Sequence, residues 1–147
     1  MKALLQRVTE ASVSVGSEVV GRIGLGLVVF VGVARGDTEK DAQYLAHKIV
    51  NLRLFSDEGG NFNLSALDII GELLVVSQFT LLAETKKGRR PDFIEAASPA
   101  QAKELFEQFV EQARATGLRV ETGRFQQYMQ VEIHNDGPVT ILLNSRG

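Results

Sequence analysis

The chain of 147 residues contains no cysteine, which excludes disulfide bonds, zinc–thiolate sites and thiol nucleophiles. Histidine is nearly absent as well, since His47 and His134 are the only two. They do not form a His-x-x-x-His metal spacing, and no Gly-x-Ser-x-Gly elbow of a serine hydrolase occurs. Cysteine and histidine ligands are therefore scarce, and we expect neither a metal nor another cofactor.

No charge of one sign dominates, and no long hydrophobic run is present. The formal net charge of −2 argues against a generally basic nucleic-acid binder but permits a local basic patch. The longest apolar run, residues 25–34, is interrupted by Gly26 and Gly32 and is far too short to span a membrane. Arg7 and Glu10 come too early for a signal peptide. We expect one cytoplasmic domain over residues 1–147, with enough apolar residues, 44%, for a core.

Hydrophobic alternation predicts a chain rich in strands. In the first third, strands are predicted over residues 3–8, 11–15, 18–23 and 24–33, with a polar turn at Thr9-Glu10. Further strands are predicted over residues 52–55, 72–79, 118–121, 129–134 and 138–144. The segment Asn135-Asp136-Gly137 predicts the turn of a C-terminal hairpin.

Two segments show helical periodicity instead. The first follows a cap at Asp37 or Thr38, and its apolar positions are Ala42, Leu45, Ala46, Ile49 and Val50. The second begins with Ser98 as cap, Pro99 at the first position and Gln101 completing a capping box, and it ends at Gly117. These elements predict an α/β fold: mixed β-sheets packed in a barrel-like β/β/α layered sandwich, with two amphipathic helices on one side.

Two polar segments lie where strands should end or begin. Ser77-Gln78-Phe79-Thr80 closes the apolar run Leu73–Val76, and Asn135–Thr140 separates two apolar runs. Strand ends that meet loops are common places for chemistry. Neither segment has a histidine or paired carboxylates, so any chemistry there must depend on backbone groups. The plain alternatives are a polar strand end and a proline that begins a strand.

The densest basic cluster is Lys86-Lys87-Gly88-Arg89-Arg90. It is either a solvated loop or a loop that neutralises phosphates. Two functional classes are compatible with these features. One is a non-enzymatic, dimeric, β-rich RNA-binding module that uses this loop. The other is a generic serine or threonine esterase, which would require His134 to reach Ser77 or Thr80.

The two polar segments together resemble the D-aminoacyl-tRNA deacylases, also called D-tyrosyl-tRNA deacylases, and the resemblance covers essentially the whole chain. The motifs that carry it are Leu5-Gln6-Arg7-Val8, Ala11-Ser12-Val13, Phe55-Ser56-Asp57, Asn63-Leu64, Val75-Val76-Ser77-Gln78-Phe79-Thr80-Leu81, Gly88 through Arg90-Pro91, Ala97-Ser98-Pro99, and Asn135-Asp136-Gly137-Pro138-Val139-Thr140.

The resemblance implies an editing enzyme that hydrolyses the ester between tRNA and a D-amino acid, or glycine mischarged on tRNA-Ala. It implies a homodimer whose active site lies at the subunit interface, with a cis Gly137-Pro138 peptide reaching into the partner's pocket as a filter against L-aminoacyl-tRNA. The family's strand-end residues correspond to Ser77, Gln78, Phe79 and Thr80. Its pocket positions correspond to Ala102, Phe125 and Met129, although core packing is the plain reading of the last two.

A mechanism that uses the backbone fits this picture. Ester hydrolysis requires stabilisation of a developing oxyanion, and the backbone N–H groups of Phe79 and Thr80 are our candidates. Because no side-chain base is evident, the neighbouring ribose hydroxyl of the tRNA would assist water activation. Carbonyl groups of Gly137-Pro138 would hold the α-ammonium, so that an L side chain would clash with the backbone. Lys86, Lys87, Arg89 and Arg90 would contact tRNA phosphates.

Overall fold

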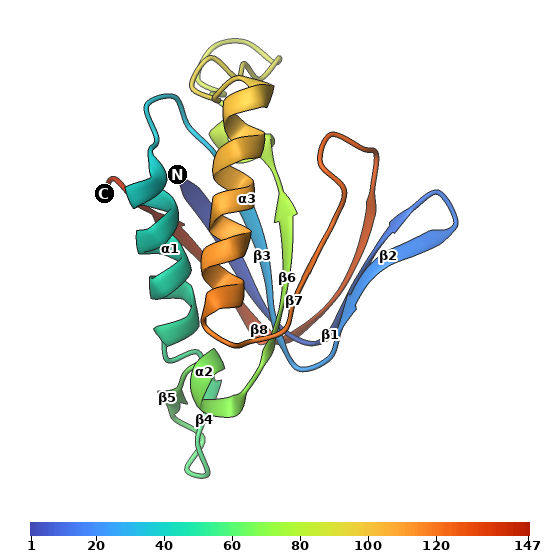
Figure 1. Ribbon diagram of the computed structural model, residues 1–147, viewed down its shortest axis with the longest axis vertical. Coiled ribbons are helices and arrows are strands. Elements are labelled where there is room, and N and C mark those ends of the chain that lie inside the picture. Colours follow the sequence, from blue (N-terminus) through green and yellow to red (C-terminus); the bar gives the residue numbers. More distant parts are fainter.

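The computed structural model describes all residues from 1 to 147 and contains one curled six-stranded sheet (Figure 1). Its strands are β1 (Lys2–Val15), β2 (Glu18–Ile23), β3 (Gly26–Gly32), β6 (Glu72–Ser77), β7 (Val120–Thr122) and β8 (Gln130–Asn144). The order is β2-β1-β3-β6-β7, and β8 pairs with β1. The pairs β3–β6 and β6–β7 are parallel and the others are antiparallel, as expected for a mixed sheet.

The predicted turn at Thr9-Glu10 is wrong, because β1 continues through these residues. Both side chains are exposed, and the β1–β8 register shifts on each side of Val8. The polar pair therefore marks an irregularity in one long strand that bends the sheet, which is a known role of β-bulges.

The predicted C-terminal hairpin is also wrong, because residues 130–144 form the single strand β8. Asn135-Asp136-Gly137 does not reverse the chain, since the residues on both sides of it pair with β1. Gln6 faces Thr140 and Val8 faces Asn135, so the β8 segment between these partners is longer than the β1 segment. The excess residues bulge out of the ladder at Gly137-Pro138.

The helices confirm the two predicted amphipathic segments. They are α1 (Glu39–Asn51), capped by Thr38, and α3 (Pro99–Ala115), capped by Ser98. The Ser98 side chain accepts a hydrogen bond from the Gln101 N–H at 3.4 Å, but no bond from the Gln101 side chain completes the predicted box. Gly117 has φ of +93° just after the α3 cap, as a C′ glycine should.

The remaining elements are short. They are β4 (Phe55–Ser56), β5 (Phe62–Leu64), α2 (Ala66–Ile69) and the 3-10 helix η1 (Phe79–Leu82). The strand predicted over residues 52–55 is displaced to β4, because the first residues of that segment form the turn after α1. The strand predicted over residues 72–79 ends at Ser77, where η1 takes over.

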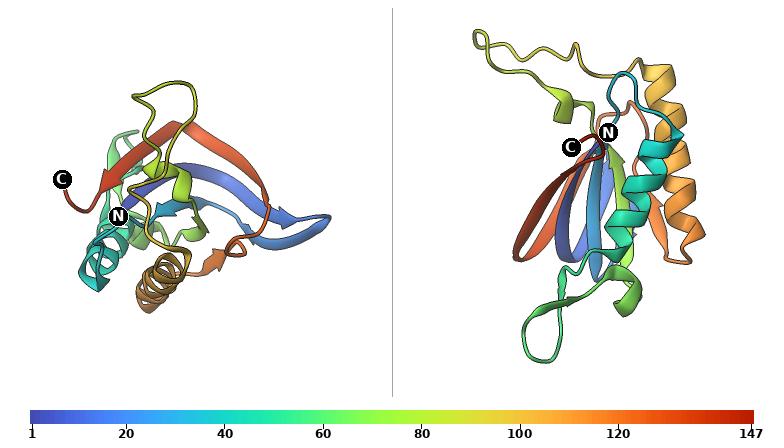
Figure 2. Two further views of the ribbon diagram at one scale, coloured as in Figure 1. Left: turned by 90° about the horizontal axis from the view of Figure 1, so that it is seen from above. Right: turned by 90° about the vertical axis from the view of Figure 1, so that its left-hand side faces the viewer.

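Two hydrophobic clusters fill the two faces of the sheet. The larger lies between the sheet and the two helices, which cover one face side by side (Figure 2), and Phe109 of α3 is buried at its centre. The smaller fills the inside of the curl with Val8, Val13, Val28 and Leu74. A Cβ on Gly21 of β2 would lie only 3.0 Å from the Thr122 carbonyl oxygen of β7. The sheet is therefore almost closed, which confirms the barrel-like, layered α/β prediction.

None of the helices is both long enough and apolar enough to cross a membrane.

Candidate active site

A cavity lies where the parallel strands β3 and β6 end. It has a volume of about 780 Å³, within the range of small-molecule sites. Val33 and Ser77, at these two strand ends, form part of its wall. Carboxyl ends of parallel strands are frequent ligand sites in open α/β sheets. The rest of the wall comes from η1, the loop before α3, the start of α3, the β7–β8 loop, and the neighbouring residues Val76 of β6 and Val131 of β8.

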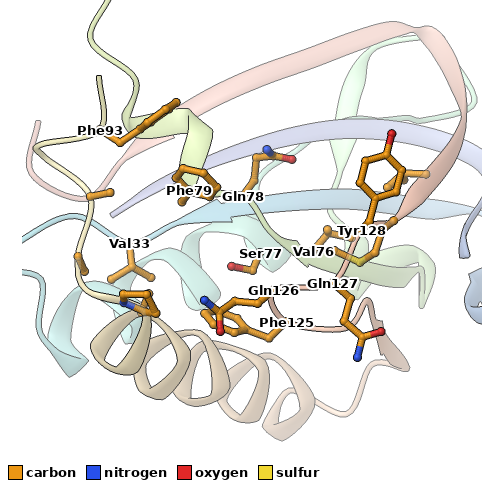
Figure 3. A pocket seen from close by; sticks show the side chains of 16 residues that line it. Val33, Val76, Ser77, Gln78, Phe79, Phe93, Phe125, Gln126, Gln127 and Tyr128 are labelled. Carbon is orange, nitrogen blue, oxygen red and sulfur yellow. The ribbon is translucent and has the colours of Figure 1, made fainter. Parts of the chain in front are cut away.

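The cavity brings together six of the residues predicted for the site. Figure 3 shows Ser77 at the end of β6, Gln78 and Phe79 directly after it, and Phe125 on the side nearer α3. Ala102 on the first turns of α3 and Met129 before β8 also line the cavity. Three predicted positions, Thr80, Gly137 and Pro138, do not belong to the lining of this protomer.

The change from strand to 3-10 helix leaves backbone donors without helical partners directly after β6. The Gln78 N–H donates to the Val31 carbonyl at 2.8 Å, which extends the β3–β6 ladder by one residue. Phe79 and Thr80 then begin η1, so their N–H groups have no partner inside that helix. The Gln78 side chain donates to Thr80 Oγ1 and so connects the residue before η1 to its second residue. Unpaired N–H groups beside a cavity are suitable oxyanion ligands.

The loop between β7 and β8 forms the opposite wall. The Phe125 ring packs against Phe106 of α3 with a centroid distance of 6.3 Å. The Met129 sulfur lies 3.3 Å from the backbone nitrogen of Arg124. A Cβ on Gly123 would lie only 2.6 Å from that sulfur, so glycine is needed for this approach. Phe125 and Met129 therefore pack within the protein and also line the cavity.

Several lining residues were not predicted. Phe93 packs edge-to-face against Phe79 at 4.9 Å, and Gln126, Gln127 and Tyr128 complete the β7–β8 loop. Gln126 has φ of +61°, an uncommon value for a residue other than glycine. Tyr128 is 95% exposed. These side chains belong to loops without periodic hydrophobicity, so no pattern in the sequence identified them.

The cavity wall contains no charged side chain. Its polar side chains come from serine, glutamine and tyrosine only, and 11 of its 16 residues are hydrophobic. His134 does not line it: this side chain is exposed, and its Nδ1 lies 3.7 Å from Glu10 Oε1 across the β1–β8 ladder. The structure therefore does not bring His134 to Ser77 or Thr80. No cluster of three or more His, Cys, Asp or Glu side chains that could hold a metal occurs.

Gly137-Pro138 lies on the exposed bulge of β8, and its peptide bond is cis. The side chain of Arg7 on β1 binds the backbone of the bulge. Its Nε donates to the Asp136 carbonyl at 3.0 Å, and its NH1 donates to the Leu54 carbonyl at 2.8 Å. Its guanidinium also lies over the Phe62 ring, 5.3 Å from the centroid. One buried arginine thus connects β1, the bulge and the β4–β5 segment.

The basic cluster lies at the tip of the loop between η1 and α3. The loop is closed at its base by two hydrogen bonds between Glu84 and Asp92, with N···O distances of 2.9 and 3.1 Å. Its tip projects away from the sheet and helices (Figure 2, right). The four cations, Lys86, Lys87, Arg89 and Arg90, are exposed and form no ion pair.

Only two carboxyl groups have clearly shifted pKa values, and both are outside the cavity. The pKa of Asp68 is lowered by the Ser65 backbone N–H and then by the Ser65 hydroxyl. For Asp41, desolvation raises the pKa, but hydrogen bonds from the Ser145 side chain and the Thr38 backbone outweigh it, so the pKa is lowered. Both aspartates occupy capping boxes, of α2 and α1 respectively.

Known proteins match the chain along its length. A D-aminoacyl-tRNA deacylase of Dehalococcoides mccartyi is 60% identical over 99% of this chain and 95% of the relative. One of Bacillus licheniformis is 58% identical, with 99% of each covered.

Among solved structures, one titled "c-Myc DNA Unwinding Element Binding Protein" is 47% identical with a TM-score of 0.92, and 98% of each chain is covered. A "probable eukaryotic D-amino acid tRNA deacylase" has a TM-score of 0.86 and 97% coverage of each chain, and its identity of 17% shows the shared fold alone. The family described as D-Tyr-tRNA(Tyr) deacylase matches residues 4–144, almost the whole chain. Together with the relatives that are about 60% identical, this match shows that the chain belongs to the D-Tyr-tRNA(Tyr) deacylase family.

Proposed function

We propose that this protein hydrolyses the ester of D-aminoacyl-tRNA in the cavity beside Ser77. The enzyme class, a carboxylic ester hydrolase of the D-aminoacyl-tRNA deacylase type, follows from the family and from the names of relatives 56–60% identical. One observation supports this cavity as the place of the reaction. It includes the Ser77-Gln78-Phe79 strand end, and it has no charged side chain. Since its substrate is charged tRNA, we place the reaction in the cytoplasm.

The backbone N–H groups of Phe79 and Thr80 would bind the developing oxyanion of the tetrahedral intermediate. Donors of this kind are fixed by the fold before the reaction, so they stabilise charge without reorganisation. No histidine or carboxylate lines the cavity to act as a base. We therefore assign assistance in activating the attacking water to the hydroxyl of the terminal ribose, which the substrate brings with it.

Selection against L-amino acids would come from main chain supplied by a second protomer. Gly137 and Pro138 are exposed and lie outside the cavity of their own protomer, so they are free to enter another. Their carbonyl groups would hold the substrate α-ammonium in a position where an L side chain meets backbone. Glycine has no side chain and would pass the same filter, so glycyl-tRNA is proposed as a second substrate.

A homodimer is supported by the outer face of β8. Leu142 is 58% exposed there, on the same strand as the Gly137-Pro138 bulge. The edge of β8 that does not face β1 has no strand partner, and such edges readily pair with another chain. A two-fold interface would place each bulge at the cavity of the other protomer and form two equal sites.

A deacylation assay on matched D- and L-tyrosyl-tRNA tests the function. We expect release of D-tyrosine, and of glycine from glycyl-tRNA, while L-tyrosyl-tRNA stays nearly intact. Equal rates on the two enantiomers would contradict the filter. A protein that binds tRNA but releases no amino acid would favour the alternative of a non-enzymatic RNA-binding module.

The basic loop is proposed to bind tRNA phosphates. Replacing Lys86, Lys87, Arg89 and Arg90 by glutamine should weaken tRNA binding and reduce its salt dependence, by a logarithmic slope of about 0.7–0.9 for each lost contact. A quadruple variant with the same salt slope as the wild type would show that the loop is only a solvated surface.

A further inference from the structure

A second groove adjoins the cavity and differs from it in charge. It has a volume of about 360 Å³ and lies between α3 and the segment that connects β7 to β8. Phe125 and Gln127 line both the groove and the cavity, so the two spaces meet at this loop. The cavity has no charged side chain, whereas the groove has three cations and one carboxylate, Lys103, Arg114, Arg124 and Glu107.

The cations of the groove are available to a ligand to different degrees. Lys103 is exposed and forms no ion pair. Arg124 has a half-exposed side chain, and its contact with Glu18 is long, at 3.9 Å. Arg114 is less available, because its NH2 already donates a hydrogen bond to the Val120 carbonyl at 3.2 Å. Glu107, one helical turn after Lys103, is the one group there that would repel an anion.

We infer that this groove binds the phosphodiester backbone of the tRNA 3′ end as it leaves the cavity; this rests on the proposed function. A terminal adenosine bound at Ser77 remains attached to the preceding nucleotide through a phosphate. The cavity wall offers no cation to neutralise that phosphate, and the groove is the cationic space that directly continues it. The basic loop tip lies elsewhere, projecting from the body of the protein (Figure 2), and would contact a different part of the tRNA.

Two double variants with the same change in charge test the groove. Lys103→Gln with Arg124→Gln removes its two available cations. Lys40→Gln with Lys48→Gln is the control, because both lysines are exposed on α1 and line neither space. Binding of uncharged tRNA is measured across a salt series. We expect the groove variant to bind on the order of three- to tenfold more weakly, with a salt slope smaller by about 0.7 for each cation removed, the value for single strands.

The control should bind tRNA like the wild type. Glu107→Gln should have the opposite effect on affinity, since removing this negative charge should tighten tRNA binding. Equal tRNA affinity and salt slope in the groove variant and the control would overturn the proposal.

Kinetics separate the groove from the active site. With D-aminoacyl-tRNA, the groove variant should show a raised KM and the wild-type kcat. With a D-aminoacyl ester of adenosine, which has no phosphate, it should show the wild-type KM. A KM raised equally for both substrates would place these residues at the terminal adenosine instead and contradict the groove. A wild-type protein inactive on both substrates would contradict the proposed function, whatever the binding data show.

Discussion

Phe79 has two groups that can be tested separately, a side chain at the cavity wall and a backbone N–H proposed as an oxyanion donor. Its ring packs against Phe93 at the cavity wall, and its N–H begins η1. Thr80 also offers a hydroxyl, which accepts from the Gln78 side chain. The proposed chemistry uses the two N–H groups and not the hydroxyl. Substitutions that separate backbone from side chain can therefore distinguish this mechanism from a threonine nucleophile.

Thr80→Ala should retain most of the wild-type kcat, because it keeps the backbone N–H. Deacylation of D-tyrosyl-tRNA in single-turnover conditions measures this step. A threonine nucleophile predicts the opposite, a rate near that of the uncatalysed reaction in a folded protein. His134→Gln is the control, since this exposed histidine does not line the cavity and should have no effect on kcat.

Phe79→Pro should lose far more activity than Phe79→Ala. Both variants lose the ring, but only proline also removes the N–H. Proline is tolerated at the first position of a helix, so the turn should persist. Removal of one oxyanion donor typically costs about 10²–10³ in kcat. Equal kcat values for the two variants, with equal stability, would exclude this N–H as an oxyanion ligand.

At the scale of elements, the helices were predictable because their signals are local. Thr38, Ser98 and Gly117 act within one helical turn, and each has the predicted role. The two failures, at Thr9-Glu10 and at residues 135–137, concern polar segments that lie inside the continuous strands β1 and β8. Polarity alone does not distinguish a turn from a bulge, because the difference depends on a partner strand distant in sequence. The lining residues Phe93 and Tyr128 were missed for a different reason, because they lie in loops where no periodic hydrophobicity shows which side chains face the cavity.

Arg7→Met should destabilise the protein and displace the β8 bulge. It leaves the carbonyl groups of Leu54 and Asp136 without their charged donor, and such bonds are worth about 1.5–3 kcal/mol each. Chemical denaturation should therefore show that the free energy of unfolding falls by on the order of 3 kcal/mol. Arg7→Lys should recover part of it. A variant with wild-type stability would contradict the role of Arg7 as a connector.

The capping carboxylate of α2 should make stability depend on pH. The lowered pKa of Asp68 means that ionisation stabilises the fold, so its contribution is present above the ordinary value of 3.8 and is lost as pH falls through the lower folded value. Asp68→Asn keeps the shape and removes the charge. It should unfold more easily than the wild type at neutral pH, and the difference in the free energy of unfolding should shrink as pH falls below 3.8 and vanish once Asp68 is protonated in the folded protein. A difference independent of pH would exclude the charge as its cause.

At the scale of the whole molecule, the position of Gly137-Pro138 separates two kinds of active site. The bulge is exposed on one face, held by Arg7, and it lies outside the cavity of its own protomer. A site contained in one protomer would not need it. A site shared across a two-fold axis would need the cavity of one protomer and the bulge of the other.

Mixing two inactive variants distinguishes these cases. Phe79→Pro impairs the cavity. Gly137→Ala impairs the bulge, because Gly137 has φ of +135° and a Cβ would lie 2.9 Å from Val139 Cγ2 and 3.1 Å from an Arg7 nitrogen. In a mixed dimer, one site combines the intact cavity of the Gly137→Ala protomer with the intact bulge of the Phe79→Pro protomer. Random exchange in an equal mixture makes half of the dimers mixed, so about a quarter of the wild-type activity should return. Activity that stays at the level of the separate variants after exchange, verified by mass spectrometry of the dimers, would mean that each protomer works alone.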